Sequence, residues 1–246
     1  MNLVIDIGNT RTKLSVFHHG EVLITVPFDE FQPEFIDVLK KEHPSLNRAI
    51  LSSVKKLESG FVHSLKTKFN TFIQLDETTP LPFENRYQSK ETLGYDRIAA
   101  VAGAHSLYPG TDVLVIDAGT AITYDLLTRE GDYLGGNISP GLSMRFKALH
   151  QFTDKLPLED PDNAQLLFGR TTGEAIRTGV QQGILYEVDK TIEAFKEIYK
   201  NLKVIITGGD VKFFDLKLKN SFFVHFNLTA FGLNSILEHN GEIKKR

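Results

Sequence analysis

Two apolar segments in this 246-residue chain end in the same short motif, an aspartate, one further residue and a glycine. The first segment ends at Asp6-Ile7-Gly8, and the second ends at Asp117-Ala118-Gly119, 111 residues later. In both copies a threonine and an alternating second strand follow. A repeat at this spacing is too long for a solenoid, so it indicates a chain built from two related α/β halves.

Each half follows the same plan, with paired strands first and then helices that alternate with strands. We divide the chain into halves of residues 1–112 and 113–246, which face each other over a cleft. Apolar residues at helical spacing predict helices over residues 33–42, 61–69, 96–107, 140–152, 172–200 and 228–239. Shorter apolar runs predict strands over 49–54, 72–75, 204–207 and 222–226. Residues 76–94 carry no strong pattern, which is typical of a disordered segment or a functional loop.

The composition excludes several classes of function. The chain has 28 lysines and arginines against 31 aspartates and glutamates, so we expect neither nucleic acid nor a membrane as a partner. It has no cysteine, which excludes disulfides, zinc-thiolate sites and thiol nucleophiles, and its eight histidines show no metal-ligand spacing. No basic leader opens the chain and no apolar run approaches the roughly twenty residues of a membrane span. We therefore expect a cytoplasmic protein.

The repeated motif has both an ordinary and a functional interpretation. A single Asp-x-Gly after a strand is common turn chemistry, because both residues tolerate tight backbone geometry. Two copies at matching positions favour a shared role, since such hairpins place N–H groups and hydroxyls around a phosphate. The aspartate can hold magnesium directly or through water. The chain contains neither a Walker P-loop nor a Gly-x-Gly-x-x-Gly turn. A nucleotide would therefore bind through the paired hairpins.

Paired Asp-x-Gly hairpins in duplicated halves resemble the sugar kinase, hsp70 and actin superfamily. Four motifs then occur in order: Asp6-Ile7-Gly8-Asn9-Thr10, Leu93-Gly94-Tyr95-Asp96-Arg97, residues 117–123 and residues 135–141. Together they closely resemble the type III pantothenate kinases, over residues 3 to about 209. Two positions depart from that pattern, Lys90 in place of a frequent proline and Thr171 in place of a frequent asparagine. Both concern loop stiffness or substrate fit more than phosphate chemistry.

The resemblance implies a fold and an activity. The fold is α/β, with duplicated ribonuclease-H-like (actin-like ATPase) domains, mixed five-stranded sheets flanked by helices, and ATP in the cleft between the halves. The activity is ATP-dependent phosphorylation of pantothenate to 4'-phosphopantothenate, the first step of coenzyme A biosynthesis. The implied cofactors are Mg²⁺ with ATP and a monovalent cation, K⁺ or NH₄⁺. The implied assembly is a homodimer.

The resemblance also assigns roles to individual residues. Asp96 is the general base on the acceptor hydroxyl, and Arg97 suits the carboxylate of pantothenate. Asp6 holds magnesium, directly or through water, and Asp117 holds the monovalent cation. The full ATP-binding set is Asp6, Ile7, Gly8, Asn9, Thr10, Arg11, Thr12, Lys13 and Thr120, with Gly208-Gly209 near the nucleoside. The substrate-binding set is Tyr87, Gly94, Tyr95, Asp96, Arg97 and Thr172.

Each assignment has a structural alternative. Asp96 can be a helix N-cap followed by a solvated Arg97, Thr172 can cap its own helix, and Lys13 can be a surface lysine. Gly179 and Gly183 suit either close packing within the chain or a dimer interface. At the level of function, the same fold can phosphorylate another acceptor, or act as an ATP-dependent sensor such as a transcriptional accessory protein. A pure sensor needs no base at Asp96.

Overall fold

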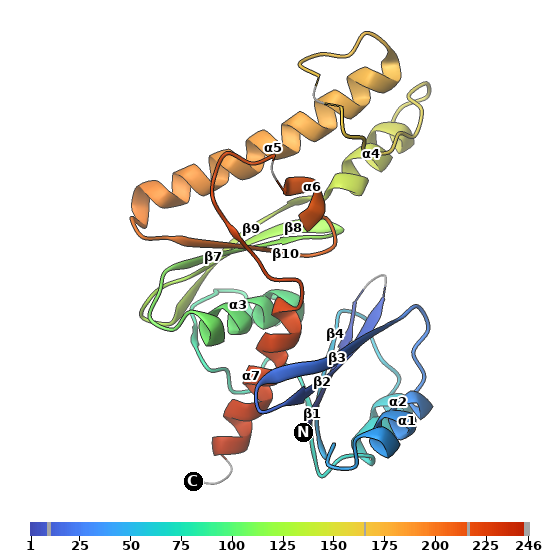
Figure 1. The fold of residues 1–246 in the computed structure, drawn as a ribbon, viewed down its shortest axis with the longest axis vertical. Helices are drawn as coiled ribbons and strands as arrows, with labels where there is room; N and C mark the ends of the chain where they lie inside the picture. The colour runs from blue at the N-terminus through green and yellow to red at the C-terminus, as the bar shows by residue number, and fades with distance from the viewer. Residues whose placement is uncertain (9–10, 165, 216, 244–246) are drawn as a thin grey trace. The chain divides into compact units, whose positions relative to one another are not determined.

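The computed structural model describes residues 1–8, 11–164, 166–215 and 217–243. These form two compact units, each a mixed β-sheet with helices against it (Figure 1). Unit 1 contains residues 1–109, 131–133 and 227–246, and unit 2 contains residues 110–130 and 134–226. The chain first passes from unit 1 to unit 2 after Pro109, close to the boundary that we predict between residues 112 and 113. The units differ from the predicted halves at the C-terminus, which returns to unit 1.

The sheet of unit 1 has five strands among the described residues, in the order β3-β2-β1-β4-β5. Strand β1 lies at its centre, antiparallel to β2 and parallel to β4, and β2 pairs antiparallel with β3 while β4 pairs parallel with β5. The bounds are β1 Asn2–Ile7, β2 Thr12–His18, β3 Glu21–Phe28, β4 Arg48–Ser53 and β5 Thr71–Gln74. The first hairpin therefore opens at the end of the central, most protected strand.

The two faces of this sheet are covered by different helices. Alternate residues such as Leu3, Ile5 and Leu51 join a core that includes Ile36 of α1 (Glu34–Glu42) and Leu65 of α2 (Ser59–Lys66). The opposite face is covered by α3 (Tyr95–Leu107) and α7 (Leu228–Ile243). Hydrogen bonds reach this face, from Asn2 Nδ2 to Asn234 Oδ1 at 2.8 Å and from Arg48 Nη1 to Glu238 Oε2 at 2.8 Å.

Close packing between α3 and α7 explains why the last helix belongs to unit 1. A Cβ added to Gly232 of α7 would lie 1.7 Å from the carbonyl oxygen of Ala99 in α3. A Cβ added to Gly103 of α3 would lie 2.4 Å from the carbonyl oxygen of Leu228. Each helix thus carries a glycine where the backbone of the other approaches it. No local pattern in the sequence reveals this pairing, because the two helices lie far apart along the chain.

Unit 2 repeats the strand order of unit 1. Its described strands run β11-β10-β7-β8-β9, with β7 antiparallel to β8 and parallel to β10. The bounds are β7 Val113–Ala118, β8 Ala121–Leu127, β9 Asp132–Pro140, β10 Lys203–Thr207 and β11 Phe223–Val224. The short strand β6 (Glu84–Asn85) pairs with the first residues of β9, so this sheet has six strands where five were expected. The duplication that the sequence predicts is present in the topology.

The helices of unit 2 are α4 (Leu142–Gln151), α5 (Thr172–Ile198) and the short α6 (Val211–Phe214). Ile184 and Val188 of α5 and Phe146 of α4 pack on Leu114 and Ile116 of the central strand β7. In Figure 1 the long helix α5 crosses one face of this sheet. The second hairpin, between β7 and β8, therefore starts from the central strand of its sheet, as the first does.

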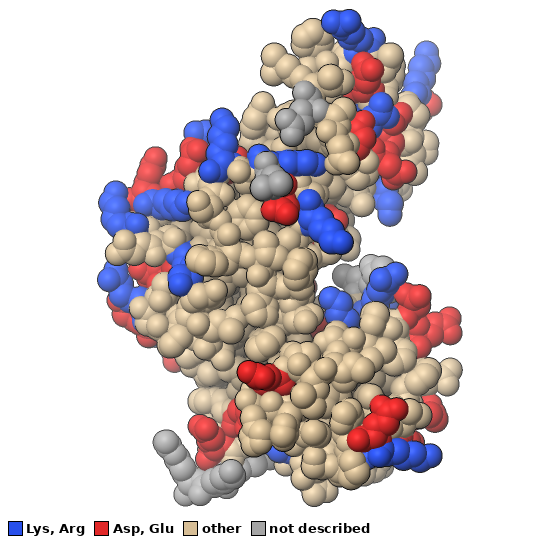
Figure 2. All heavy atoms as spheres, in the orientation of Figure 1, with Lys and Arg blue, Asp and Glu red and all other residues tan. Residues whose placement is uncertain are grey.

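The surface drawn in Figure 2 carries mixed charge, with Lys and Arg side chains among Asp and Glu side chains. Among the helices that the structure describes, none combines the length and the apolar character that a membrane crossing requires.

Candidate active site

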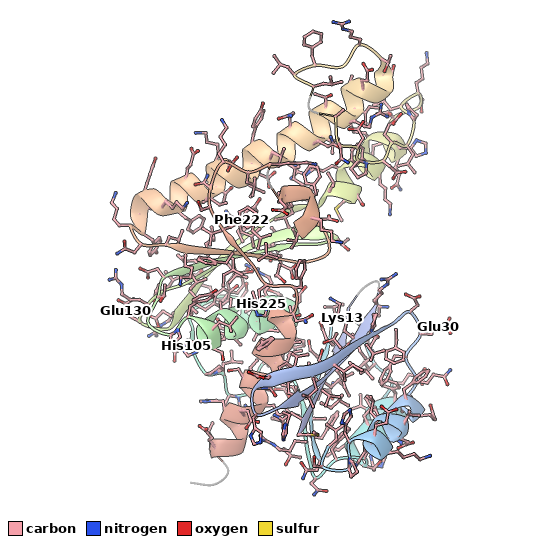
Figure 3. All side chains as sticks on the ribbon, in the orientation of Figure 1. Lys13, Glu30, His105, Glu130, Phe222 and His225 are labelled. Carbon is pink, nitrogen blue, oxygen red and sulfur yellow. The ribbon has the colours of Figure 1, made fainter. Side chains whose placement is uncertain are left out.

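The first hairpin places Asp6 beside Lys13. Gly8 N–H donates a hydrogen bond to the carbonyl oxygen of Arg11 at 3.0 Å, which closes the turn. Asp6 on β1 is in register with Lys13 on β2, whose position after the hairpin is labelled in Figure 3. The predicted residues Asn9 and Thr10 lie outside the described residues. Asp6 and Lys13 thus face the same side of the sheet.

The predicted neighbours along the hairpin occupy distinct environments. Thr12 is buried at the start of β2, while Arg11 is exposed and pairs with the exposed Asp29 at 3.1 Å. Such exposed ion pairs contribute little to stability. Ile7 packs into the core of unit 1. The side chain of Ile7 is therefore not available to a phosphate.

The surroundings of the Asp6 carboxylate raise its pKa. Burial raises its pKa, the positive charge of Lys13 lowers it, and the negative charge of Asp96 raises it, with a result of about 6. Two carboxylates that repel each other in a partly buried setting favour a bound cation. Oxygen ligands suit Mg²⁺, which usually takes one or two carboxylates and completes its shell with phosphates and water. In the described part of the chain, no cluster of three or more His, Cys, Asp or Glu suited to a metal is found.

Asp96 and Arg97 lie in the first turn of α3. The N-cap of this helix is Gly94, in extended backbone, so the alternative in which Asp96 caps the helix is wrong. Asp96 Oδ1 instead accepts a hydrogen bond from the backbone N–H of Arg97 at 2.9 Å. A Cβ at position 94 would lie 2.4 Å from this Oδ1. Glycine at this position leaves room for the side-chain conformation of Asp96.

Arg97 is buried rather than solvated, with 5% of its surface exposed. Its guanidinium carbon lies 5.4 Å from the centroid of the Tyr87 ring. The Tyr87 ring in turn stacks on Tyr133, with centroids 6.1 Å apart and planes 11° apart. Burying a guanidinium is costly unless it has partners, and the Tyr87 ring is one of the partners of Arg97.

One further predicted substrate residue, Tyr95, and one departure from the family pattern, Lys90, lie close to this cluster in the sequence. Tyr95 is the first residue of α3, and burial, followed by the charges of Asp76 and Glu77, raises the pKa of its hydroxyl. Lys90 lies in the exposed 3₁₀ turn of residues 90–92. Its departure from the family pattern therefore falls on the surface of the loop. Tyr87, Gly94, Tyr95, Asp96 and Arg97 all belong to unit 1, together with Asp6 and Lys13.

The second hairpin differs from the first in one respect. Gly119 N–H donates to the carbonyl oxygen of Ala121 at 3.1 Å and closes a turn. The residue in register with Asp117 is the uncharged Thr123, where Asp6 faces Lys13. The position opposite Asp117 on β8 is thus polar and uncharged, whereas the position opposite Asp6 on β2 carries a positive charge.

Glycines from two other segments pack on this second hairpin. Gly141 N–H donates to the carbonyl oxygen of Thr120 at 3.1 Å, and a Cβ at Gly141 would lie 2.1 Å from the carbonyl oxygen of Gly119. Gly208 has φ +98°, and its Cβ would lie 2.5 Å from Asp117 Oδ1. The Gly-Gly segment after β10 therefore lies next to the second hairpin.

A network of ionic hydrogen bonds, which the sequence did not indicate, holds the end of β9 just before Gly141. Arg145 donates to the carbonyl oxygen of Pro140 at 2.8 Å and to Glu187 Oε2 at 2.5 Å. Ser139 and Tyr124 also donate to Glu187. Burial opposes ionisation of Glu187, but these hydrogen bonds and the charge of Arg145 hold its pKa below the usual value. The sequence signal was absent because the partners come from four separate elements.

Thr172 lies at the start of α5 in unit 2, and the cap of that helix is Thr171. Thr171 Oγ1 accepts from the backbone N–H of Glu174 at 3.2 Å, and Glu174 accepts from the N–H of Thr171 at 3.3 Å. This capping box contradicts the alternative in which Thr172 caps the helix. It also gives Thr171, where the family often has asparagine, a structural role, since both residue types are good N-caps.

The chain has two like hairpins, each at the central strand of its sheet, and the two sheets have the same strand order. This fold is that of the sugar kinases and actin-like ATPases. A protein from Campylobacter jejuni described as a Baf family transcriptional activator is 24% identical, with TM-score 0.63 over 98% of this chain and 99% of that one. A glucokinase from an Antarctic psychrotroph is 11% identical, with TM-score 0.54 over 97% and 98%. At these identities the likeness concerns the fold.

The type III pantothenate kinase family matches residues 2–194, and the chain belongs to this family. A type III pantothenate kinase of Christiangramia forsetii is 47% identical over 98% of this chain and 99% of that protein. A type III pantothenate kinase of Phocaeicola vulgatus is 43% identical over 99% and 100%. The resemblance read from the four motifs is confirmed, and it extends over nearly the whole chain.

Proposed function

We propose that this protein transfers a phosphoryl group from ATP to pantothenate, giving 4'-phosphopantothenate, in the first step of coenzyme A biosynthesis in the cytoplasm. The observation that carries the proposal is the cluster of Asp96 and the buried Arg97 at the start of α3, with the charge of Asp96 acting on Asp6. It unites a candidate base, a carboxylate-binding cation and a metal-binding carboxylate in unit 1. Family membership over nearly the whole chain supports the choice of acceptor.

In this proposal Arg97 binds the carboxylate of pantothenate. A guanidinium can hold a carboxylate through two parallel hydrogen bonds, and it gains strength where water is excluded. Tyr87, stacked on Tyr133, fixes one face of Arg97 and so limits the directions from which a substrate can approach. Arg97 thus orients the acceptor and brings its primary hydroxyl to Asp96.

Asp96 then accepts the proton of that hydroxyl. Phosphoryl transfer has a loose transition state, so orienting the hydroxyl matters as much as removing its proton. The hydrogen bond from Arg97 N–H to Asp96 Oδ1 holds the carboxylate in place, while its second oxygen remains for the substrate. Gly94 and Tyr95 line the same turn, and Thr172 is the further residue that we propose to contact pantothenate.

Each hairpin, within its own unit, is proposed to contribute contacts to the nucleotide. The first supplies Asp6, Lys13 and the backbone from Ile7 to Thr12, and the second supplies Thr120. Magnesium, held at Asp6, neutralises charge on the phosphates when it is bound. Asp117 would hold a monovalent cation, K⁺ or NH₄⁺, beside the second hairpin. Lys13 adds a fixed positive charge next to Asp6.

The alternative role as an ATP-dependent sensor has less support. The Campylobacter jejuni protein described as a transcriptional activator shares the fold at 24% identity, which does not extend to a shared role. A sensor does not need a carboxylate held by a backbone N–H beside a buried arginine. The Asp96–Arg97 arrangement therefore favours catalysis.

The activity is tested by measuring ADP release with ATP and magnesium, with and without pantothenate. We expect release to depend on pantothenate and to be faster in potassium than in sodium, because Asp117 is proposed to hold the larger ion. Mass spectrometry of the product should show one added phosphoryl group. ADP release at the same rate without pantothenate would contradict the assignment of the acceptor, and equal rates in both salts would contradict the monovalent cation.

We also propose that the protein is a homodimer, with α5 at the interface. Gly179 and Gly183 are exposed on this helix, and a Cβ on either would meet no atom within 4 Å. They therefore do not serve close packing within the chain. Tyr186, one turn further along the same face, is 56% exposed, and Ile138 of β9 is 63% exposed. Small and apolar residues open to solvent together are typical of an interface between subunits.

The dimer is tested by sedimentation velocity, in which the wild type should show twice the 27.7 kDa mass of one chain. Gly183→Arg should shift the protein toward monomer, because the side chain has free space in the single chain but none in a close helix contact. Gly60→Arg is the matched control, since the Cβ of Gly60 in α2 also meets no atom within 4 Å. A Gly183→Arg protein that keeps the wild-type mass would argue against α5 as the interface.

A further inference from the structure

A row of polar residues crosses three neighbouring strands of unit 1. Asp6 on β1 is in register with Lys13 on β2 and with Ser52 on β4. Side chains alternate along a strand, and the neighbours Ile5 and Leu51 point into the core on the opposite face. Asp6, Lys13 and Ser52 therefore project from one face, the face on which α3 contacts β4. Ser52 thus lies beside Asp6, on the face of the sheet that α3, the helix containing Asp96, contacts.

The hydroxyl of Ser52 is buried without a partner. Ser52 is 1% exposed, and among the described residues its Oγ makes no hydrogen bond. An unsatisfied buried hydroxyl costs about 1–3 kcal/mol, so such groups usually have a partner in the working state of the protein. The sequence pattern did not indicate this, because Ser52-Ser53 at the end of a strand is also an ordinary strand ending.

A second serine on the same face provides a contrast. Ser15 of β2 is also 1% exposed, and its Oγ lies 2.9 Å from Thr25 Oγ1 of β3. Burial on this face is therefore compatible with a satisfied serine. The difference is position, since Ser15 lies two residues further from the hairpin than Lys13, whereas Ser52 lies next to Asp6.

We propose that Ser52 is a binding residue of the phosphate site, whose hydroxyl forms a hydrogen bond with the magnesium–nucleotide complex held beside Asp6. The hydroxyl either donates to a phosphate oxygen or accepts from a water of the magnesium shell. This inference rests on the proposed function only in placing a nucleotide at Asp6. The bond supplies the partner that Ser52 Oγ lacks in the protein alone, and it adds a neutral contact to the charged pair of Asp6 and Lys13.

The test compares Ser52→Ala with Ser15→Ala in the full chain. Titration calorimetry measures ADP binding with magnesium and in EDTA, and pantothenate binding, while thermal unfolding is followed on ligand-free protein. We expect Ser52→Ala to weaken magnesium–ADP binding about 10-fold and to unfold at the wild-type temperature or above, because it removes an unsatisfied group. Ser15→Ala should show the reverse, a lower unfolding temperature with wild-type affinity, because Thr25 loses its partner.

The outcomes separate the possibilities. Weaker ADP binding with and without magnesium assigns the bond to a phosphate oxygen, and weaker binding with magnesium alone assigns it to a metal-bound water. Unchanged ADP affinity, or a loss confined to pantothenate, overturns the proposal. Ser52→Cys controls for a disturbance of packing by alanine, because cysteine fills the space of the serine side chain but is a weak hydrogen-bond donor. We expect Ser52→Cys to weaken ADP binding as Ser52→Ala does. ADP binding does not depend on the acceptor, so failure here is distinguishable from failure of the turnover test.

Discussion

Asp96→Asn is expected to lower kcat by roughly 10²–10⁴-fold, the contribution typical of a general base. Asparagine keeps the size of the side chain and can still accept the hydrogen bond from Arg97 N–H that now measures 2.9 Å at Asp96 Oδ1. It cannot take the proton of the acceptor hydroxyl. The loss should therefore appear in kcat, with the KM for ATP changed little, because Asp96 is not part of the nucleotide-binding hairpins.

The measurement is steady-state ADP release at saturating pantothenate, together with calorimetric binding of pantothenate. Asp37→Asn is the control, since Asp37 makes only an exposed ion pair with Lys68 at 2.6 Å on the α1 side of unit 1. It should leave kcat near the wild-type value. If Asp96→Asn retains more than a tenth of wild-type kcat, Asp96 orients the substrate at most, and the base must be sought elsewhere.

Asp6→Asn is expected to raise the stability of the metal-free protein and to abolish most of its activity. The pKa of Asp6 is raised from 3.8 to about 6, chiefly by burial, against the attraction of Lys13. Near neutral pH the protein therefore bears the cost of an ionised, poorly solvated carboxylate, which asparagine removes. We expect a gain of about 3 kcal/mol in the free energy of unfolding, from 1.36 kcal/mol for each pKa unit between 3.8 and about 6, a shift that already includes the attraction of Lys13.

The sign of this effect fixes its dependence on pH. Because the folded pKa of Asp6 lies above the unfolded value, the wild type is favoured in acid and loses stability as pH rises from about 4 through about 6. The difference between Asp6→Asn and wild type should thus be small near pH 4, grow between pH 4 and 6, and stay constant above that. Denaturant unfolding at several pH values in EDTA measures it.

A buried aspartate with satisfied partners should behave in the opposite way. Asp112 is 6% exposed and accepts a hydrogen bond from the backbone N–H of Arg129 at 2.9 Å. Asp112→Asn should lower stability, because it removes charge from a carboxylate that faces Arg129.

Turnover by Asp6→Asn should fall on the order of 10²-fold or more, since the magnesium site loses its carboxylate. A less stable Asp6→Asn protein would show that Asp6 serves the fold rather than the site.

Much of the local structure followed from the sequence. Helices expected over residues 33–42, 96–107 and 172–200 are α1, α3 and α5, with ends displaced by two residues at most. The segment of residues 76–94, which lacks a clear pattern, contains only the short β6 and a 3₁₀ turn. Elements of two or three residues carry too little periodicity to predict. The strand expected over 222–226 shortens to Phe223–Val224 for the same reason.

The sequence by itself determined the two hairpins at Asp6 and Asp117, because a strand, a turn and a second strand are specified by neighbouring residues. The family and the residues at the start of α3 followed from the same local motifs. Only the tertiary structure decided which distant residues meet these motifs. Burial of Arg97 against Tyr87, the return of α7 to unit 1 and the unpartnered Ser52 beside Asp6 depend on strand register and helix packing. Those contacts join residues far apart in the chain, where no periodicity links them.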